Sequence, residues 1–127
     1  MARVSGLHHV QLAAPAGSEP KMREFFGEVL GLTETDKPAD LAARGGVWFR
    51  GPGFELHVGI EKDFVPAKKA HPGLLVDDLE GLAARITGVG HEIRRDDPLL
   101  VPGGGEFTRF YATDPVGNRL EFLQRVR

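Results

Sequence analysis

Hydrophobic and polar residues alternate along the first half of the chain in a way that predicts one strand, one helix and one hairpin. Residues 7–14 alternate with a period of two, which is typical of a strand and places His9 and Gln11 on the same face. A helix should follow, because apolar residues recur at the spacing of one helical face: Met22, Phe25, Phe26, Val29 and Leu30. After a polar loop at 33–40, two strands are predicted at 46–50 and 54–60.

The same order of elements is predicted again in the second half. Residues 71–76 predict a strand, and Asp77 or Asp78 should cap a helix with the apolar stripe Leu79, Leu82, Ala83 and Ile86. Residues 91–94 predict a short strand, and a last hairpin is expected at 107–112 and 118–124. Residues 95–106 contain two prolines and three consecutive glycines, so we expect an irregular stretch there, either a mobile loop or a lid over a site.

The last predicted hairpin carries a glutamate, Glu121, in the middle of its second strand. Asp114-Pro115 is typical of the start of a turn, and Gly117-Asn118 tolerates the positive φ that can close one. In the strand that follows, Leu120 and Phe122 share one face and Glu121 points to the other, away from the expected core. Taken alone, a glutamate in such a place is more often solvent-facing than functional.

Residues with metal-ligand chemistry recur at equivalent places in the two halves. His9 and His71 lie near the start of each first strand, and His57 and Glu121 each lie four residues after a hairpin glycine. Any one of these histidines is more often a hydrogen-bonded or exposed residue than a ligand. Four such groups in repeated positions favour a metal site, which would form if the two sheets enclosed a trough with all four side chains inside. Imidazole and carboxylate without thiolate suit Zn, Ni, Mn, Co or Fe(II).

The composition narrows the classes of protein to which the chain could belong. A chain of 127 residues is long enough for one compact domain, which the repeat divides into modules at about 1–62 and 68–127. The chain has no cysteine, which excludes a disulfide framework and a cysteine nucleophile. Sixteen basic and eighteen acidic residues nearly balance, so no nucleic-acid or membrane partner is expected. There is no apolar run of the kind found in signal peptides or membrane spans, and we therefore expect a cytoplasmic protein.

Four segments carry a resemblance to a known superfamily. They are Gly6-Leu7-His8-His9-Val10, residues 25–32 (Phe-Phe-Gly-Glu-Val-Leu-Gly-Leu), His71 with Val76-Asp77-Asp78-Leu79, and residues 110–122 (Phe-Tyr-Ala-Thr-Asp-Pro-Val-Gly-Asn-Arg-Leu-Glu-Phe). Over nearly its whole length the chain resembles the vicinal oxygen chelate superfamily, which includes glyoxalase I, fosfomycin-resistance thiol transferases, methylmalonyl-CoA epimerase, extradiol dioxygenases and bleomycin-resistance proteins. The resemblance implies an α+β fold in which two βαβββ modules form an incomplete barrel around a divalent metal.

The resemblance also implies a ligand set. His9, His71 and Glu121 match the metal ligands of the superfamily, and His57 lies where glyoxalase I carries a carboxylate or carboxamide. His57 is then a fourth ligand or a general base. Arg109 and Tyr111 share one strand face and are expected to bind substrate, although Arg109 equally suits a surface position.

These observations predict a metal-dependent glyoxalase-like enzyme, assembled as a homodimer, with redox-neutral lyase, isomerase or addition chemistry. Its small-molecule substrate would be chelated through vicinal oxygens. Two alternatives stay open. Two histidines and one glutamate also suit an extradiol-type ring-cleaving dioxygenase, and a metal-independent drug- or metabolite-binding protein of the bleomycin-resistance type would keep the fold without the metal.

Overall fold

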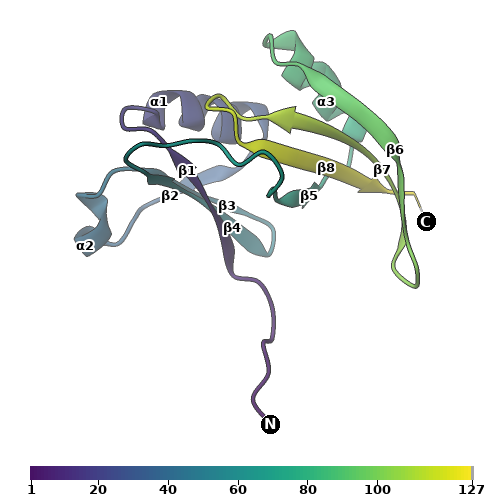
Figure 1. Ribbon diagram of the computed structural model, residues 1–127, viewed down its shortest axis with the longest axis horizontal. Coiled ribbons are helices and arrows are strands. Elements are labelled where there is room, and N and C mark those ends of the chain that lie inside the picture. Colours follow the sequence, from purple (N-terminus) through teal and green to yellow (C-terminus); the bar gives the residue numbers. More distant parts are fainter. Residues whose placement is uncertain (127) are drawn as a thin grey trace. The chain divides into compact units, whose positions relative to one another are not determined.

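The computed structural model describes residues 1–126 and divides the chain into two compact units, with the division between Val65 and Pro66. Each unit is a four-stranded sheet accompanied by helices (Figure 1). The first unit contains β1 (His9–Ala14), α1 (Glu19–Met22), η1 (Arg23–Val29), β2 (Thr33–Thr35), α2 (Ala39–Ala42), β3 (Val47–Gly51) and β4 (Phe54–Ile60). The second contains β5 (Gly73–Leu75), α3 (Leu79–Gly88), β6 (Ile93–Val101), β7 (Gly105–Thr113) and β8 (Arg119–Arg125).

The two sheets have the same topology. Their strand orders are β1-β4-β3-β2 and β5-β8-β7-β6, so the first and last strands of each unit lie side by side. These two strands are parallel, and the other neighbours are antiparallel. The α+β class and the two βαβββ modules expected from the sequence are thereby confirmed. Among residues 1–126, no helix is both long and apolar enough to cross a membrane.

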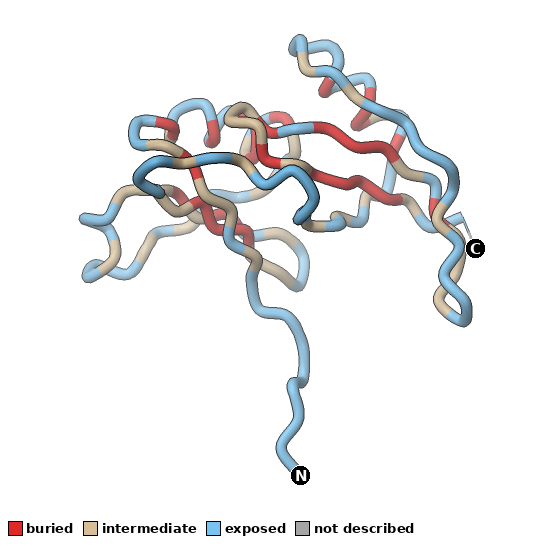
Figure 2. Tube along the Cα trace, in the orientation of Figure 1, coloured by how far each residue is buried: buried red, intermediate tan, exposed pale blue. Residues whose placement is uncertain are grey.

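Each unit has its own set of buried apolar residues, which lie on its helix and on the strands of its sheet (Figure 2). In the first unit the predicted stripe is buried at Met22, Phe25, Phe26 and Val29, whereas Leu30 is only partly buried. Residues 23–29 form a π-helix, in which the Leu30 N–H donates to the carbonyl oxygen of Phe25. The stripe packs against the apolar face of β3 and β4, which carries Val47, Phe49, Leu56 and Val58.

The second unit repeats this arrangement with a regular α-helix. Asp78 caps α3, and its carboxylate accepts a hydrogen bond from the Gly81 N–H at 3.0 Å. The buried stripe of α3 is the predicted one: Leu79, Leu82, Ala83 and Ile86. On the sheet, Phe110 pairs with Phe122 and Ala112 with Leu120, and all four are buried. In both units the opposite face of the sheet therefore carries the polar side chains.

The structure corrects two expectations about loops. Residues 95–106 are not an irregular loop, because β6 and β7 continue as a long hairpin that turns at residues 102–104. Pro98 is accommodated because β6 is an edge strand whose register shifts between Asp96 and Leu99, where no ladder N–H is required. The stretch at 33–40 is also not all loop, since it contains β2 and the start of α2.

Candidate functional site

The turn before β8 fixes the position of Glu121. Asp114 is buried, and its Oδ1 accepts hydrogen bonds from the backbone N–H groups of Val116 (3.0 Å) and Asn118 (2.8 Å). Its Oδ2 accepts from the Asn118 side-chain amide at 2.8 Å. Burial raises the pKa of the Asp114 carboxyl, although these hydrogen bonds oppose the shift. Gly117 adopts φ +97°, which closes the turn, and β8 then starts at Arg119, two residues before Glu121 on the polar face.

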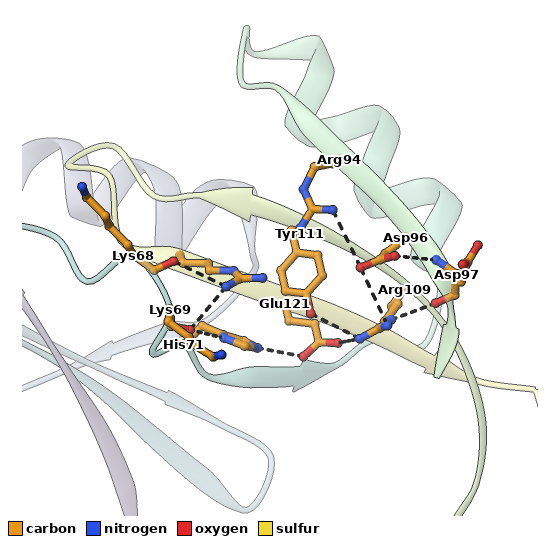
Figure 3. A network of polar contacts seen from close by, with 10 residues as sticks. Lys68, Lys69, His71, Arg94, Asp96, Asp97, Arg109, Tyr111 and Glu121 are labelled. Carbon is orange, nitrogen blue, oxygen red and sulfur yellow. Dashed lines mark hydrogen bonds and ion pairs between the residues drawn. The ribbon is translucent and has the colours of Figure 1, made fainter. Parts of the chain in front are cut away.

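Glu121 is held on both carboxylate oxygens. Oε1 lies 3.0 Å from Nε2 of His71, and Oε2 accepts a hydrogen bond from Nη1 of Arg109 at 2.9 Å (Figure 3). The Glu121 side chain is 9% exposed. Burial by itself would raise the pKa of Glu121, but the hydrogen bonds and charges of Arg109 and His71 outweigh it and lower the pKa. Glu121 is therefore ionised at neutral pH.

The two contacts of His71 together constrain its protonation. Nδ1 lies 2.8 Å from the carbonyl oxygen of Lys69, which can only accept, so Nδ1 must carry a hydrogen. In the neutral ring Nε2 then has a lone pair that faces the Glu121 carboxylate. Two lone pairs at 3.0 Å repel each other unless a positive species lies between them. The pair is thus built to share a cation, either the proton of an imidazolium or a metal ion.

Arg109 and Tyr111, predicted to bind substrate, lie in this same network. Arg109 donates from Nη1 to the Tyr111 hydroxyl oxygen (3.2 Å) and from Nε to the Asp97 carbonyl oxygen (2.9 Å), as well as to Glu121. The hydrogen bond to Glu121 raises the pKa of the Arg109 guanidinium. Tyr111 is the cross-strand partner of Glu121, and its ring meets that of His71 edge-on at 5.4 Å.

In the first unit, His57 is held by ring stacking and by one contact with a carboxylate. Its ring lies between those of Trp48 (centroids 3.7 Å apart, planes at 1°) and His9 (4.2 Å, 15°). Its Nε2 lies 2.9 Å from Oε1 of Glu55, and only 3% of the side chain is exposed. The contact with His57 lowers the pKa of the Glu55 carboxyl. His57 therefore has one nitrogen engaged and a ring that cannot easily turn.

His9 completes the stack at the exposed end. Its Nδ1 lies 2.9 Å from Nδ1 of His8, which leaves Nε2 as the nitrogen that could bind a metal. Within each unit the structure thus brings together one pair of the predicted ligands, His9 with His57 and His71 with Glu121. Residues 1–126 contain no group of three or more histidine or carboxylate side chains arranged to hold a metal ion. The four-ligand site stays a prediction.

Strand register supports the equivalence of His57 and Glu121. Glu121 is paired with Gly73, two residues after His71, and His57 is paired with Gln11, two residues after His9. Sequence reasoning missed other residues on the two polar faces: Trp48, Glu55, Arg94 and Arg119. The signal was present for two of them, since Glu55 and Arg119 each lie two positions from a predicted ligand and so share its face.

No family model and no curated protein matches the chain. Solved structures do match it, and they identify its family. A glyoxalase family protein from Bacillus anthracis is 39% identical, with 98% of each chain covered and a TM-score of 0.88. Lactoylglutathione lyase from Agrobacterium tumefaciens is 20% identical, with 97% of this chain and 96% of that chain covered and a TM-score of 0.65. The antibiotic-binding protein TnmS3 from a Streptomyces species is 20% identical, with 98% and 99% covered and a TM-score of 0.68. The chain belongs to the glyoxalase family, within the vicinal oxygen chelate superfamily.

Proposed function

We propose that the protein is a metal-dependent, glyoxalase-like enzyme that carries out redox-neutral lyase, isomerase or addition chemistry on a small molecule. Membership of the glyoxalase family supports the class of protein. The observation that supports a metal is the contact between His71 and Glu121, in which an imidazole nitrogen lies 3.0 Å from a carboxylate oxygen. The substrate would present two neighbouring oxygens.

The donor set of this chain fits a divalent cation. His71 and Glu121 would share the cation, because Nε2 of His71 faces the carboxylate while its Nδ1 faces a carbonyl oxygen, and His9 would offer its Nε2. Two imidazoles and one carboxylate are suitable ligands for Zn, Ni, Mn, Co or Fe(II). A bound ion would act as a Lewis acid toward the two substrate oxygens. The second oxygen of Glu121 stays on Arg109, which would hold the carboxylate in place as a ligand.

His57 is proposed as a fourth ligand or as the general base. When Nε2 donates to Glu55, the lone pair of the neutral ring is on Nδ1, which could accept a proton from the substrate. The stack between His9 and Trp48 fixes the ring plane and so the direction of that lone pair. Glu55 would also stabilise the imidazolium formed when the proton is taken.

One observation favours the metal-independent alternative, a binding protein like its Streptomyces neighbour. Glu121 is already neutralised by Arg109, and His57 is already paired with Glu55. Such internally satisfied groups could line a ligand site without any metal. The extradiol-type dioxygenase alternative differs in needing Fe(II) and oxygen, with only two histidines and one carboxylate as ligands.

Turnover assays on thiol hemiacetals, epoxides and catechols, with and without oxygen, separate these possibilities. We expect oxygen-independent turnover that needs added metal, and we expect His57→Ala to abolish it while weakening metal affinity less than His71→Ala does. Strict dependence on Fe(II) with stoichiometric oxygen uptake would overturn the redox-neutral assignment. Tight binding of a ligand by metal-free protein, with no turnover in any metal, would favour the binding protein.

We also propose that the protein is a homodimer. Strands β1, β2, β5 and β6 are sheet edges, and edge strands offer unpaired backbone groups for association. On β5, Leu75 is 75% exposed, and burying it against a second copy of the chain would remove that apolar surface from water. Light scattering at micromolar concentration should give twice the mass of the chain, and a monomer there would contradict the proposal.

A further inference from the structure

Three arginines surround the ring of Tyr111 on the polar face of the second sheet. The Cζ atoms of Arg94, Arg109 and Arg119 lie 4.7, 5.8 and 4.5 Å from the ring centroid. Arg94 comes from β6, where it is the cross-strand partner of Tyr111, and Arg119 comes from the first position of β8. Figure 3 shows Arg94 and Glu121 at opposite ends of the Tyr111 side chain.

Of the three guanidinium groups, Arg109 has short contacts with protein partners, whereas those of Arg94 and Arg119 are long. Arg109 bonds to Glu121, to the Tyr111 hydroxyl and to the Asp97 carbonyl. Arg94 has Asp96 at 3.7 Å, which is too long for a hydrogen bond, and its side chain is 62% exposed. Arg119 makes two long contacts, 3.4 and 3.5 Å, to the carbonyl oxygens of Lys68 and Lys69, and among residues 1–126 it has no carboxylate partner.

The local charge is therefore unbalanced. Three guanidinium groups share this surface with two carboxylates, Asp96 and Glu121, and Glu121 is also the partner of His71. Contact with the ring holds the guanidinium groups of Arg94 and Arg119 against Tyr111 while leaving their N–H edges able to donate. Tyr111 adds a donor, because its hydroxyl accepts from Arg109 and keeps its own hydrogen.

We infer that Arg94 and Arg119, held against the Tyr111 ring, bind an oxyanion of the substrate, a carboxylate or a phosphate group. Arginine forks match either group, and an anion would offset the excess of positive charge around the Tyr111 ring. Because Tyr111 is paired with Glu121, this anion would lie beside the proposed reacting centre. The inference rests on the proposed function in treating the anion as part of a substrate, and it names the class: a small oxygen-rich acid or phosphate ester.

Calorimetric titration of protein stripped with EDTA tests this site without the metal. The probes are inorganic phosphate and lactate, with lactamide as the neutral analogue of lactate, at low ionic strength. Arg94→Gln and Arg119→Gln should each weaken binding of the preferred anion by about tenfold. Arg95→Gln is the matched control, because Arg95 is the next residue on β6 and pairs with Glu80 instead. It should change the affinity less than about twofold.

Binding of phosphate alone would point to a phosphate ester, binding of lactate alone to a carboxylic acid, and binding of both to the shared oxyanion chemistry. Equal affinity for lactamide, no binding of either anion, or an equal loss in Arg95→Gln would overturn the inference. Metal content of the same variants separates the two proposals. If the protein binds the anion but takes up no metal, the anion site is supported and the metal-dependent function is contradicted. If it takes up metal but binds no anion, the anion site is contradicted and the metal-dependent function is supported.

Discussion

The two units have the same strand order and equivalent strand pairing, yet the central residues of their polar faces are held by different kinds of interaction. His57 and Glu121 occupy equivalent positions. Glu121 is fixed by an ion pair to Arg109 and a contact with His71, whereas His57 is fixed by stacking between two rings, with one contact with Glu55. A repeated fold thus preserves where a side chain points and leaves its chemistry free to diverge.

The largest effect on stability is expected from removing the arginine that neutralises Glu121. Arg109→Met keeps much of the side-chain volume but leaves a nearly buried carboxylate with only His71, and should cost about 3 kcal/mol at neutral pH. Urea unfolding measures this. The double variant Arg109→Met with Glu121→Gln should be more stable than Arg109→Met alone, because no charge is then left unpaired. Simple addition of the two single costs would show that the ion pair does not fix Glu121.

In the first unit, removing the stacked ring should cost somewhat less. His57→Ala opens a gap between His9 and Trp48 and should lower the free energy of unfolding by about 2 kcal/mol. His57→Phe keeps a ring in the stack and should recover most of that loss, because Glu55 is exposed enough to be hydrated. If the phenylalanine variant is as unstable as the alanine variant, the hydrogen bond to Glu55 holds His57 and the contrast between the units disappears.

A smaller effect with a defined pH dependence is expected for Glu121→Gln. The folded-state pKa of Glu121 is lowered, so its ionised form stabilises the protein above the ordinary glutamate pKa of about 4.3. This contribution is lost as the pH falls through the folded-state pKa. Glu121→Gln should therefore be less stable than the parent by about 1 kcal/mol at pH 7, and the difference should shrink as the pH falls below about 4.3 and vanish below the folded-state pKa of Glu121. Unfolding curves at several pH values would show a constant difference if the ion pairs were irrelevant.

The smallest effect on stability is expected at Arg50, which, like Arg109, is paired with a glutamate of a neighbouring strand. Arg50 is paired with Glu55 in the first unit, but its side chain is 62% exposed and the contact is 3.4 Å. Arg50→Met should change the free energy of unfolding by less than about 0.5 kcal/mol. A cost comparable to that of Arg109→Met would mean that ion pairing matters equally in both units.

The fold was predictable from the sequence wherever periodicity decides it. The helical stripes and the period-two strands give the order of elements, and the hairpin glycines give the equivalence of His57 and Glu121. The hairpin of β6 and β7 was missed because Pro98 and three glycines indicate a loop, whereas an edge strand with a register shift can contain a proline. The partners Trp48 and Arg94 were missed for another reason. They reach His57 and Tyr111 across neighbouring strands, and such contacts depend on register, which the pattern along one strand does not contain.

The central claim, a metal held by His9, His71 and Glu121, is tested most directly by metal analysis. Protein purified without added metal and then dialysed against Zn, Ni, Mn, Co or Fe(II) should retain about one ion per chain of at least one of them. His71→Ala and Glu121→Ala should lose most of this metal, whereas His91→Ala, a histidine outside the repeated pattern, should keep it. Equal retention by all three variants, or no retention by the parent protein in any metal, would contradict the account.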